Sequence, residues 1–396
     1  GNSVRPARAG NGDHQGSGRV GGDGVMAKLG EVCKVSPSTK NIERQGAWLL
    51  NLDMVEQQTG RVIEYKYVGE DDLNGSIIQF DTENVLYSKL RPNLNKVVLP
   101  QKDGFSTSEL LPLRPDARVL NRDYLAVFLR SDSFVTWAVS KTAGAKMPRL
   151  GTKDLMSAEI PVPTIEQQKK IAEKFKKLEQ LISLRNQQLA KLDELVKARF
   201  VEMFGDPKAN CQKKKLSQIG NISTGTTPSM KELSYYERDD IPFIKPSDLN
   251  ENGVAVIDKA EMFISEKARS VARIIPPDAV LVTCIGTIGK IGIAKTESSC
   301  NQQINYIVPK DNINPIYLAY CLLLLKDILV SMANAPVVPI INKTQFSEFS
   351  IPISELNQQN QFASFVERVD QQKQTIQQSL EKLELLKKAL MQEYFG

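Results

Sequence analysis

The sequence predicts an α+β protein in which two mixed α/β domains alternate with two long helices packed as an antiparallel coiled coil, in a pseudo-two-fold arrangement. The first observation is a repeat: Ile160–Gly205 and Ile351–Gly396 align without a gap, with roughly one position in three identical. The second is that both copies carry apolar residues at heptad spacing, the pattern of a coiled coil. The third is that short apolar runs, separated by glycine and proline, precede each copy and predict short strands.

The chain divides into segments on this basis. Residues 26–155 and 208–345 are predicted to form the two domains, and residues 156–207 and 346–396 the two helices. Residues 1–25 are rich in glycine and lack the apolar core of a signal peptide. They predict a disordered leader, or an artefact of expression or gene-start assignment, because patterned sequence begins at Met26.

The composition excludes several classes of function. The formal charge of +5 permits nucleic-acid binding without arguing for it. The single histidine, His14, lies in the leader, which excludes imidazole bases and histidine metal ligands. No apolar run reaches the roughly 18 residues expected of a membrane span. An odd number of cysteines without a CxxC pair predicts reduced, mostly packed thiols in a cytoplasmic protein: Cys33, Cys211, Cys284, Cys300 and Cys321.

The first domain contains several strand candidates and one helix candidate. Gly60–Gly69 alternates like a half-buried strand, and Glu109–Leu113 is a second short strand. Asn84–Lys89 is a third, which leads into a turn-rich loop. Asp123–Val139 has the apolar spacing of a helix.

The first long helix follows an extended segment, Ile160–Pro163, that its two prolines require. Thr164 and Gln167 have the spacing of a capping box, and Gly205 with Pro207 ends the helix. The seam predicted from the heptad spacing is Phe175, Leu178, Ile182, Arg185, Leu189, Leu192, Val196, Arg199 and Met203.

The second domain matches the first in layout, so the two are predicted to be homologous. The corresponding segments are Lys28–Val32 and Lys215–Ile219, Asn84–Ser88 and Ala279–Thr283, and Asp123–Ala126 and Ile316–Ala319. The second long helix carries its own seam: Val366, Val369, Lys373, Ile376, Leu380, Leu383, Lys387, Leu390 and Tyr394.

Each apolar seam needs a partner, and the nearest is the other copy. A helix of about 40 residues spans roughly 60 Å, and a long crossover between two such helices favours antiparallel packing. Two diverged domains on this spacer suit two different sites, which on DNA would be major grooves one or two turns of about 34 Å apart. Basic seam residues either pack their stems and leave the charges in solvent, or pair with acids of another subunit: Arg185, Arg199, Lys373 and Lys387.

The duplicated unit resembles the spacer helices of specificity (S) subunits of type I restriction-modification enzymes. The shared order is Ile-Pro-x-Pro, Glu-Gln-Gln, a coiled coil and Phe-Gly-Asp-Pro, and the resemblance covers Met26–Gly396. The first domain lacks the Gly-Thr-Thr-Pro-Ser and Gly-x-x-Gly-x-x-Gly strings of the second. Segments that resemble target-recognition domains of the family are Ile222–Ser229, Tyr235–Tyr236, Ile241–Leu249 and Val282–Gly292, and in the first domain Tyr65–Gly69 and Leu86–Arg91.

The resemblance implies a DNA-binding subunit without catalytic activity. Each recognition domain would bind one half of a bipartite asymmetric DNA site. The spacer helices would hold two modification (M) subunits, which methylate adenine with S-adenosylmethionine. Restriction (R) subunits would complete an ATP- and Mg²⁺-dependent endonuclease that serves host defence. The alternative function is a coiled-coil scaffold whose globular ends bind proteins.

The sequence supplies no coherent catalytic set. It contains no Asp/Asn-Pro-Pro-Tyr methyltransferase motif, and Ile291 follows Lys290 where a Walker A loop requires Ser or Thr. A metal-dependent nuclease core of Asp53, Glu64 and Lys66 is an alternative, although acidic and basic residues often share a face of a short strand.

Candidate DNA contacts come from polar and basic loops, because Lys and Arg bind phosphates and polar side chains contact base edges. The loops are Ser88–Lys96, Lys141–Arg149, Thr226–Arg238 and Thr283–Lys290. An ordinary solvated loop is the alternative for each. The residues predicted to contact DNA are Lys89, Arg91, Asn93, Asn95, Lys96, Lys146, Arg149, Thr226, Thr227, Ser229, Lys231, Tyr236, Arg238, Thr283, Thr287 and Lys290.

Overall fold

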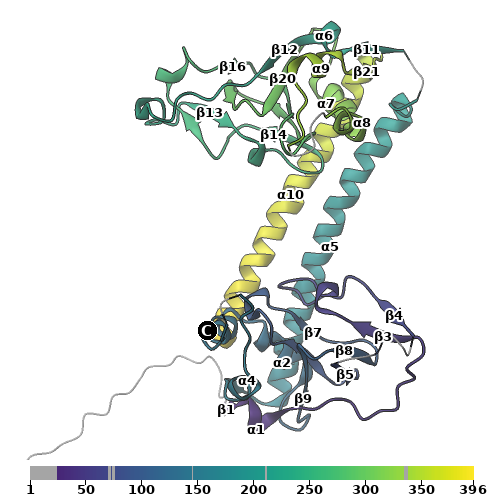
Figure 1. The fold of residues 1–396 in the computed structure, drawn as a ribbon, viewed down its shortest axis with the longest axis vertical. Helices are drawn as coiled ribbons and strands as arrows, with labels where there is room; N and C mark the ends of the chain where they lie inside the picture. Colours follow the sequence, from purple (N-terminus) through teal and green to yellow (C-terminus); the bar gives the residue numbers. More distant parts are fainter. Residues whose placement is uncertain (1–24, 70–72, 74–75, 145, 210–211, 334–337) are drawn as a thin grey trace, which may run out of the picture. The chain divides into compact units, whose positions relative to one another are not determined.

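The computed structural model describes residues 25–69, 73, 76–144, 146–209, 212–333 and 338–396 (Figure 1). They fall into two compact units, one ending at Leu184 and completed by Leu380–Gly396, the other comprising Arg185–Ser379. His14 and Cys211 lie outside the described residues. So does the predicted leader apart from Val25, which begins the first strand.

The first unit contains two sheets and several short helices. The strand order is β2-β9-β6-β7 in one sheet and β4-β3-β8-β5 in the other, and β1 pairs with β10. The elements are β1 Val25–Lys28, α1 Leu29–Val32, β2 Cys33–Val35, β3 Ala47–Leu50, β4 Lys66–Val68, β5 Ile77–Phe80, β6 Val85–Ser88, β7 Val97–Val98, β8 Gly104–Thr107, β9 Leu110–Pro115, α2 Arg122–Leu129, α3 Asp132–Ser140, α4 Thr152–Met156 and β10 Glu159–Val162.

Two predictions for this unit need correction. The strand predicted at Gly60–Gly69 is wrong up to Tyr65, because only Lys66–Val68 pairs as a strand. Gly60 has φ +67° and lies against the Val97 carbonyl too closely for any Cβ, so the chain turns there. The predicted helix at Asp123–Val139 is two helices, because Ser131 accepts a hydrogen bond from Phe134 N (3.3 Å) and caps a new one.

A buried carboxylate, Asp81, links β5 to β9. It accepts hydrogen bonds from Ser38 Oγ (2.7 Å) and from Arg114 Nη2 (2.6 Å). Burial alone would raise the pKa of Asp81, but these hydrogen bonds outweigh it and hold the pKa below the ordinary value of 3.8. The folded state therefore favours the ionised carboxylate of Asp81. Its contribution to stability is fully present above pH 3.8 and is lost as the pH falls through the lowered pKa.

We expect Asp81→Asn to lower the free energy of unfolding by about 3 kcal/mol at neutral pH, because it leaves the Arg114 guanidinium without its buried partner. The difference from the parent chain should shrink as pH falls through and below 3.8. Urea denaturation at several pH values measures both. Asp103→Asn is the control, because the ion pair of Asp103 with Lys40 is partly exposed and worth at most about 1 kcal/mol. A difference that does not vary with pH would contradict this account.

The second unit repeats the first. Its sheets have the orders β12-β20-β17-β18-β14 and β15-β13-β19-β16, and β11 pairs with β21. Apart from the added β14, each order is that of the first unit, strand for strand along the chain. The elements are β11 Lys213–Lys215, α6 Leu216–Ile219, β12 Gly220–Thr224, β13 Ile241–Ile244, β14 Val254–Ile257, β15 Phe263–Ile264, β16 Ile274–Ile275, β17 Val280–Thr283, β18 Ile291–Ala294, β19 Ser298–Cys300, β20 Ile304–Pro309, α7 Pro315–Leu324, α8 Lys326–Ser331, α9 Lys343–Glu348 and β21 Ser350–Pro352.

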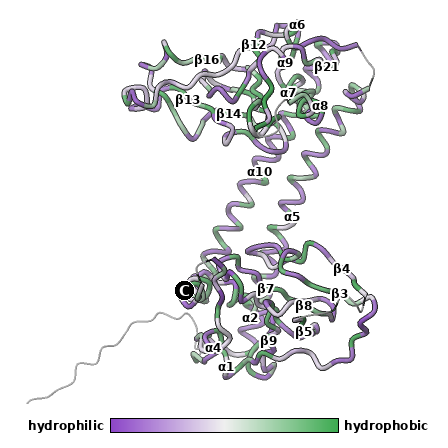
Figure 2. The backbone as a smooth tube through the Cα atoms, viewed as in Figure 1, coloured by the Kyte–Doolittle hydropathy of each residue, from purple (hydrophilic) through white to green (hydrophobic). Residues whose placement is uncertain are grey.

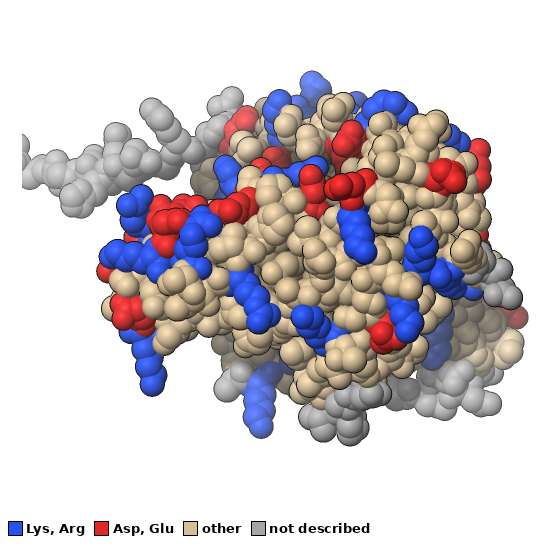
Figure 3. Space-filling view, turned by 90° about the horizontal axis from the view of Figure 1, so that it is seen from above, with Lys and Arg blue, Asp and Glu red and all other residues tan. Residues whose placement is uncertain are grey.

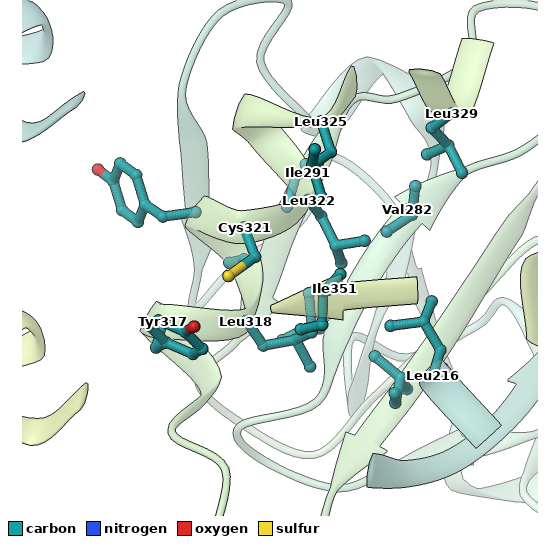
Figure 4. Close-up of a cluster of buried hydrophobic side chains, with 14 of the residues drawn as sticks. Leu216, Val282, Ile291, Tyr317, Leu318, Cys321, Leu322, Leu325, Leu329 and Ile351 are labelled. Carbon is teal, nitrogen blue, oxygen red and sulfur yellow. The ribbon is translucent and has the colours of Figure 1, made fainter. Parts of the chain in front are cut away.

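The core of the second unit packs α7 and α8 against the sheet. Figure 4 shows Leu322 and Leu325 beside Ile291 of the sheet, and Leu318 beside Ile351. Burial raises the pKa of Cys284 in this core to about 12, and that of Cys33 in the first unit to about 12. Both thiols therefore stay protonated and behave as the small apolar packing residues that were predicted.

Equivalent hydrogen bonds attach each long helix to its unit. Gln168 is fully buried, accepts from Asn121 N (2.7 Å) and donates to Val119 O (2.9 Å) and Pro163 O (2.8 Å). Tyr124 Oη donates to Pro161 O (2.8 Å) in the same unit.

The second unit repeats this arrangement. The buried Gln359 accepts from Asn314 N (2.8 Å) and donates to Ser354 O (2.8 Å) and Asn312 O (3.4 Å). Tyr317 Oη donates to Pro352 O (3.0 Å). Homologous domains were predicted from short matching strings, and the shared topology and these contacts agree with that prediction.

The two long helices, α5 (Ile165–Phe204) and α10 (Leu356–Phe395), each have 40 residues. Thr164 and Gln167 form the predicted capping box: Thr164 N donates to Gln167 Oε1 (3.0 Å) and Gln167 N to Thr164 Oγ1 (3.3 Å). Every residue of the two predicted seams is buried or half-buried. In Figure 2 hydrophobic residues recur along two otherwise hydrophilic helices.

Contacts within each unit show that α5 and α10 run antiparallel. In the first unit Phe175 packs on Phe395 at 6.4 Å between ring centroids, and Lys387 Nζ pairs with Glu179 at 3.2 Å. In the second unit Phe200 packs on Phe362 at 5.3 Å. As the residue number rises on α5, the partner number falls on α10.

The basic seam residues have partners that the sequence did not indicate. Lys373 Nζ pairs with Asp193 at 2.6 Å, as Lys387 does with Glu179, so both lysines bind acids of the opposite helix in the same chain. Arg199 pairs with Glu202 (2.8 Å) on its own helix, and Arg185 Nη1 donates to Gln188 (2.9 Å). Three of the four basic seam residues therefore pair with acids of their own chain, and Arg185 donates to a neutral amide.

Candidate nucleic-acid interface

The loops predicted to contact DNA meet at one edge of the sheets in the second unit. Strands β12 and β17 both lie antiparallel to β20, so their carboxyl ends lie beside the amino end of β20. The carboxyl end of β19 lies at the same edge, because the short segment 301–303 connects it to the amino end of β20. Thr226 N donates to Cys300 O (2.9 Å) and Cys284 N to Gln303 O (2.8 Å), which ties the loops together. We call this the loop edge, formed in the second unit by residues 225–231, 283–290 and 301–303. Arg238 lies instead near the amino end of β13, whose carboxyl end, Ile244, meets Asn301 at the loop edge.

The first unit has an equivalent loop edge, formed by residues 88–96, 108–109 and 141–149 without residue 145. Leu150 N donates to Lys89 O (2.9 Å) and Arg91 N to Pro148 O (2.8 Å). Arg149 Nε pairs with Glu109 at 3.1 Å. The structure therefore brings together two loops that lie about 50 residues apart in the sequence.

The predicted contact residues of the first unit divide into two groups. Arg91, Asn93 and Lys146 are exposed, and Lys89 is half-buried. Arg149 is exposed but already paired with Glu109.

The other two predicted residues of this loop support it from inside. Asn95 is buried and donates to Arg130 O (3.1 Å). Lys96 Nζ donates to Leu52 O (2.5 Å), and burial lowers the pKa of Lys96. Both side chains hold the loop in shape, so the exposed group carries the stronger candidates for DNA contact.

The glycine-containing loop between β17 and β18 is a tight turn. Gly286 and Gly289 have φ values of +76° and +81°, which favour glycine. Thr283 is fully buried and accepts from Lys290 N (3.0 Å), while Lys290 Nζ pairs with Glu251 at 2.9 Å. Thr283 and Lys290 therefore stabilise the turn, and Thr287 is left exposed at its tip.

The loop after β12 is held by its own polar side chains. Thr226 Oγ1 accepts from Arg273 N (2.9 Å), and Tyr236 Oη donates to Pro228 O (2.7 Å). Arg238 Nη2 pairs with Asp240 at 3.1 Å. The exposed members of this loop among the predicted contacts are Thr227, Ser229, Lys231 and Arg238.

Sequence reasoning missed Asn301, Gln302, Gln303 and Arg273 at this edge. Thr227 Oγ1 donates to Gln302 Oε1 (2.5 Å), and Arg273 Nη1 donates to Thr224 O (2.6 Å). A polar Asn-Gln-Gln run between two apolar strands was the available signal, because carboxamides are common readers of base edges.

Charge alone does not locate a DNA surface. On the face seen in Figure 3, Lys and Arg side chains are interspersed with Asp and Glu. Lys208 and Lys215 of the second unit, for example, pair with Asp327 and Glu348. The candidate interface therefore rests on the convergence of loops rather than on a basic patch.

The alternative of a nuclease core has no support in the geometry. Glu64 lies before β4 and not on it, while Asp53 lies in a separate short turn. Among the described residues, no group of three or more His, Cys, Asp or Glu side chains is placed to hold a metal ion. Within the same residues, no helix has the length and apolarity needed to cross a membrane.

Comparison with known proteins gives a consistent result. The model of the "Type I restriction modification DNA specificity domain" family matches residues 25–194 and 208–385. The MjaIX specificity subunit of Methanocaldococcus jannaschii is 31% identical over 40% of this chain and 37% of its own length. The HindI specificity subunit of Haemophilus influenzae is 20% identical over 69% of this chain and 78% of its own length.

A solved structure shares the fold. A chain from a study of complex assembly and conformational transition in a type I restriction-modification system superimposes with a TM-score of 0.60 at 18% identity, covering 94% of this chain and 98% of that chain. The predicted resemblance and fold class are confirmed by these matches. Specificity subunits of this family carry no catalytic site, in agreement with the prediction that the chain is not an enzyme on its own.

Proposed function

We propose a function from one premise: the chain belongs to the family of type I restriction-modification DNA specificity domains. Its two recognition domains, residues 26–155 and 208–345, each bind one half of a bipartite asymmetric DNA site. The spacer helices, residues 156–207 and 346–396, set the gap between the half-sites and dock two modification subunits. The chain acts in the cytoplasm, and S-adenosylmethionine, ATP and Mg²⁺ belong to the modification and restriction subunits.

One observation carries this proposal: the same sheet order occurs twice, with different side chains at the same loop edge. At the junction of β8 and β9 the first unit places the ion pair Glu109–Arg149. At the equivalent junction of β19 and β20 the second unit places carboxamides, Gln302 and Gln303. Different side chains on the same scaffold favour two different half-sites, because specificity comes from the groups at base edges.

The exposed cations at the loop edges should bind phosphates. We expect Arg91→Ala and Lys231→Ala each to weaken DNA binding by similar factors for all sequences. Each should reduce the slope of log K against log salt concentration by about 0.9, because each removes one phosphate contact. Fluorescence anisotropy of the complex with its modification subunits, titrated with duplex DNA at several salt concentrations, measures the slope.

Lys214→Ala is the matched control, because Lys214 is exposed on β11, away from the loop edge. Its slope should equal that of the parent complex. A parent complex that shows no salt-dependent DNA binding would refute the proposed function and favour a scaffold with protein-binding ends. A methylome of the source cell would add the target itself, since the proposal requires adenine methylation in a bipartite, asymmetric motif.

A further inference from the structure

The segment Asn301–Gln303 is held in place by three neighbouring elements. Asn301 N donates to Ile244 O (3.2 Å) at the end of β13. Thr226 N and Cys284 N donate to the carbonyls of Cys300 and Gln303, as described above. The backbone that carries Gln302 is therefore fixed at the loop edge, while its side chain is exposed.

The oxygen atom of each glutamine side chain in this segment already accepts one hydrogen bond. Thr227 Oγ1 donates to Gln302 Oε1 (2.5 Å), and Asn301 Nδ2 donates to Gln303 Oε1 (2.9 Å). Within the described part of the chain, Nε2 of Gln302 makes no hydrogen bond. Gln302 thus keeps both N–H donors unused, while Thr227 takes one of the two acceptor positions of its oxygen.

From these available N–H donors we infer that Gln302 is a specificity-determining residue of the second recognition domain and that it binds guanine. The inference rests on the proposed function. A carboxamide with both atoms available pairs with adenine, donating to N7 and accepting from N6. A carboxamide whose oxygen is already held by the protein has its two N–H donors as the more available groups, and guanine presents two neighbouring acceptors, O6 and N7, in the major groove.

The inference concerns only the half-site of the second domain. In the first unit the equivalent junction carries Glu109, whose carboxylate is held by Arg149 at 3.1 Å. No glutamine occupies that junction. Changes at Gln302 should therefore leave the half-site of the first domain as it is, which gives every experiment an internal reference.

The test is selection from a randomised duplex DNA library by the full chain in complex with its modification subunits. Gln302→Glu replaces the donors with acceptors at nearly constant shape, so one guanine of the second half-site should change to cytosine, whose N4 donates. The preference at that position should shift by about tenfold or more, in line with one good base contact.

Thr227→Val is the second variant. It removes the hydrogen bond that holds Gln302 Oε1, so the carboxamide can donate and accept, and adenine should join guanine at the same position. Gln212→Glu is the matched control, because it makes the same chemical change at an exposed residue next to β11, and its motif should equal that of the parent.

The outcomes separate the two proposals. A parent complex that selects no DNA refutes the proposed function itself. A bipartite motif that is the same in the parent and in Gln302→Glu overturns the inference and leaves the function standing. If the added charge abolishes binding, Thr227→Val decides: a gain of adenine at one position supports the inference, and an unchanged motif overturns it.

Discussion

Insertion of one heptad into each of the two long helices is expected to lengthen the gap between the half-sites by about three base pairs and to leave both half-site sequences unchanged. Seven residues of helix add about 10.5 Å, and B-DNA rises about 3.4 Å per base pair. This prediction follows from the proposal that α5 and α10 together set the spacing of the target.

The seam determines where the insertions belong. The pair Glu179–Lys387 lies in the first unit and the pair Asp193–Lys373 in the second. Insertion after Leu184 in α5 and after Ser379 in α10 falls between these pairs and at the boundary of the two units on both helices, so each unit keeps its own contacts. Because a whole heptad is inserted, the residues that follow the insertion keep their positions in the apolar repeat.

Selection from a library with variable gap length measures the effect. An insertion in α5 alone is the control, because it leaves one seam longer than the other and should abolish selective binding rather than shift the gap. A folded double-insertion variant that loses both half-site preferences would contradict the role of the helices in spacing, and so would one that keeps the parent gap.

The features that could be predicted from the sequence depend on local pattern. The heptad seams from Phe175 to Met203 and from Val366 to Tyr394 follow from the spacing of apolar side chains, and each is buried or half-buried in the structure. The capping box of Thr164 and Gln167 depends on residues three apart. The repeat supports these predictions further, because the chain carries each long helix twice.

The features that the sequence did not reveal depend on partners distant in the chain. Thr283 and Lys290 look like loop residues available to DNA, yet they bond to each other and to Glu251. Lys96 donates to a carbonyl 44 residues away. The oxygen of the Gln302 side chain is held by Thr227, which lies on another strand connection. No spacing rule in the sequence encodes such contacts, because they exist only after the sheets have formed.

The duplicated glutamines should be the most sensitive positions for stability. We expect Gln168→Leu to lower the free energy of unfolding by about 3 to 5 kcal/mol, because it leaves Asn121 N–H and the carbonyls of Val119 and Pro163 without their partner in a buried site. A buried polar group that loses its hydrogen bond costs about 1–3 kcal/mol, and leucine offers neither donor nor acceptor in return.

The consequence should reach beyond stability, because Gln168 joins the first turn of α5 to the start of α2 in the first unit. Gln359 makes the equivalent link between α10 and α7 in the second unit, so Gln359→Leu should cost a similar amount. Each variant should weaken recognition of its own half-site more than that of the other, since each loosens one domain on its own helix.

Chemical denaturation and library selection measure the two effects separately. The neighbouring glutamine provides a matched control: Gln167 is exposed and contributes only to the capping box, so Gln167→Leu should cost about 1 kcal/mol and leave the motif unchanged. Equal costs for Gln167→Leu and Gln168→Leu would mean that the buried hydrogen bonds are not what holds the helix to its domain. A large cost for Gln168→Leu with no bias between half-sites would mean that they stabilise the fold without orienting the recognition domain.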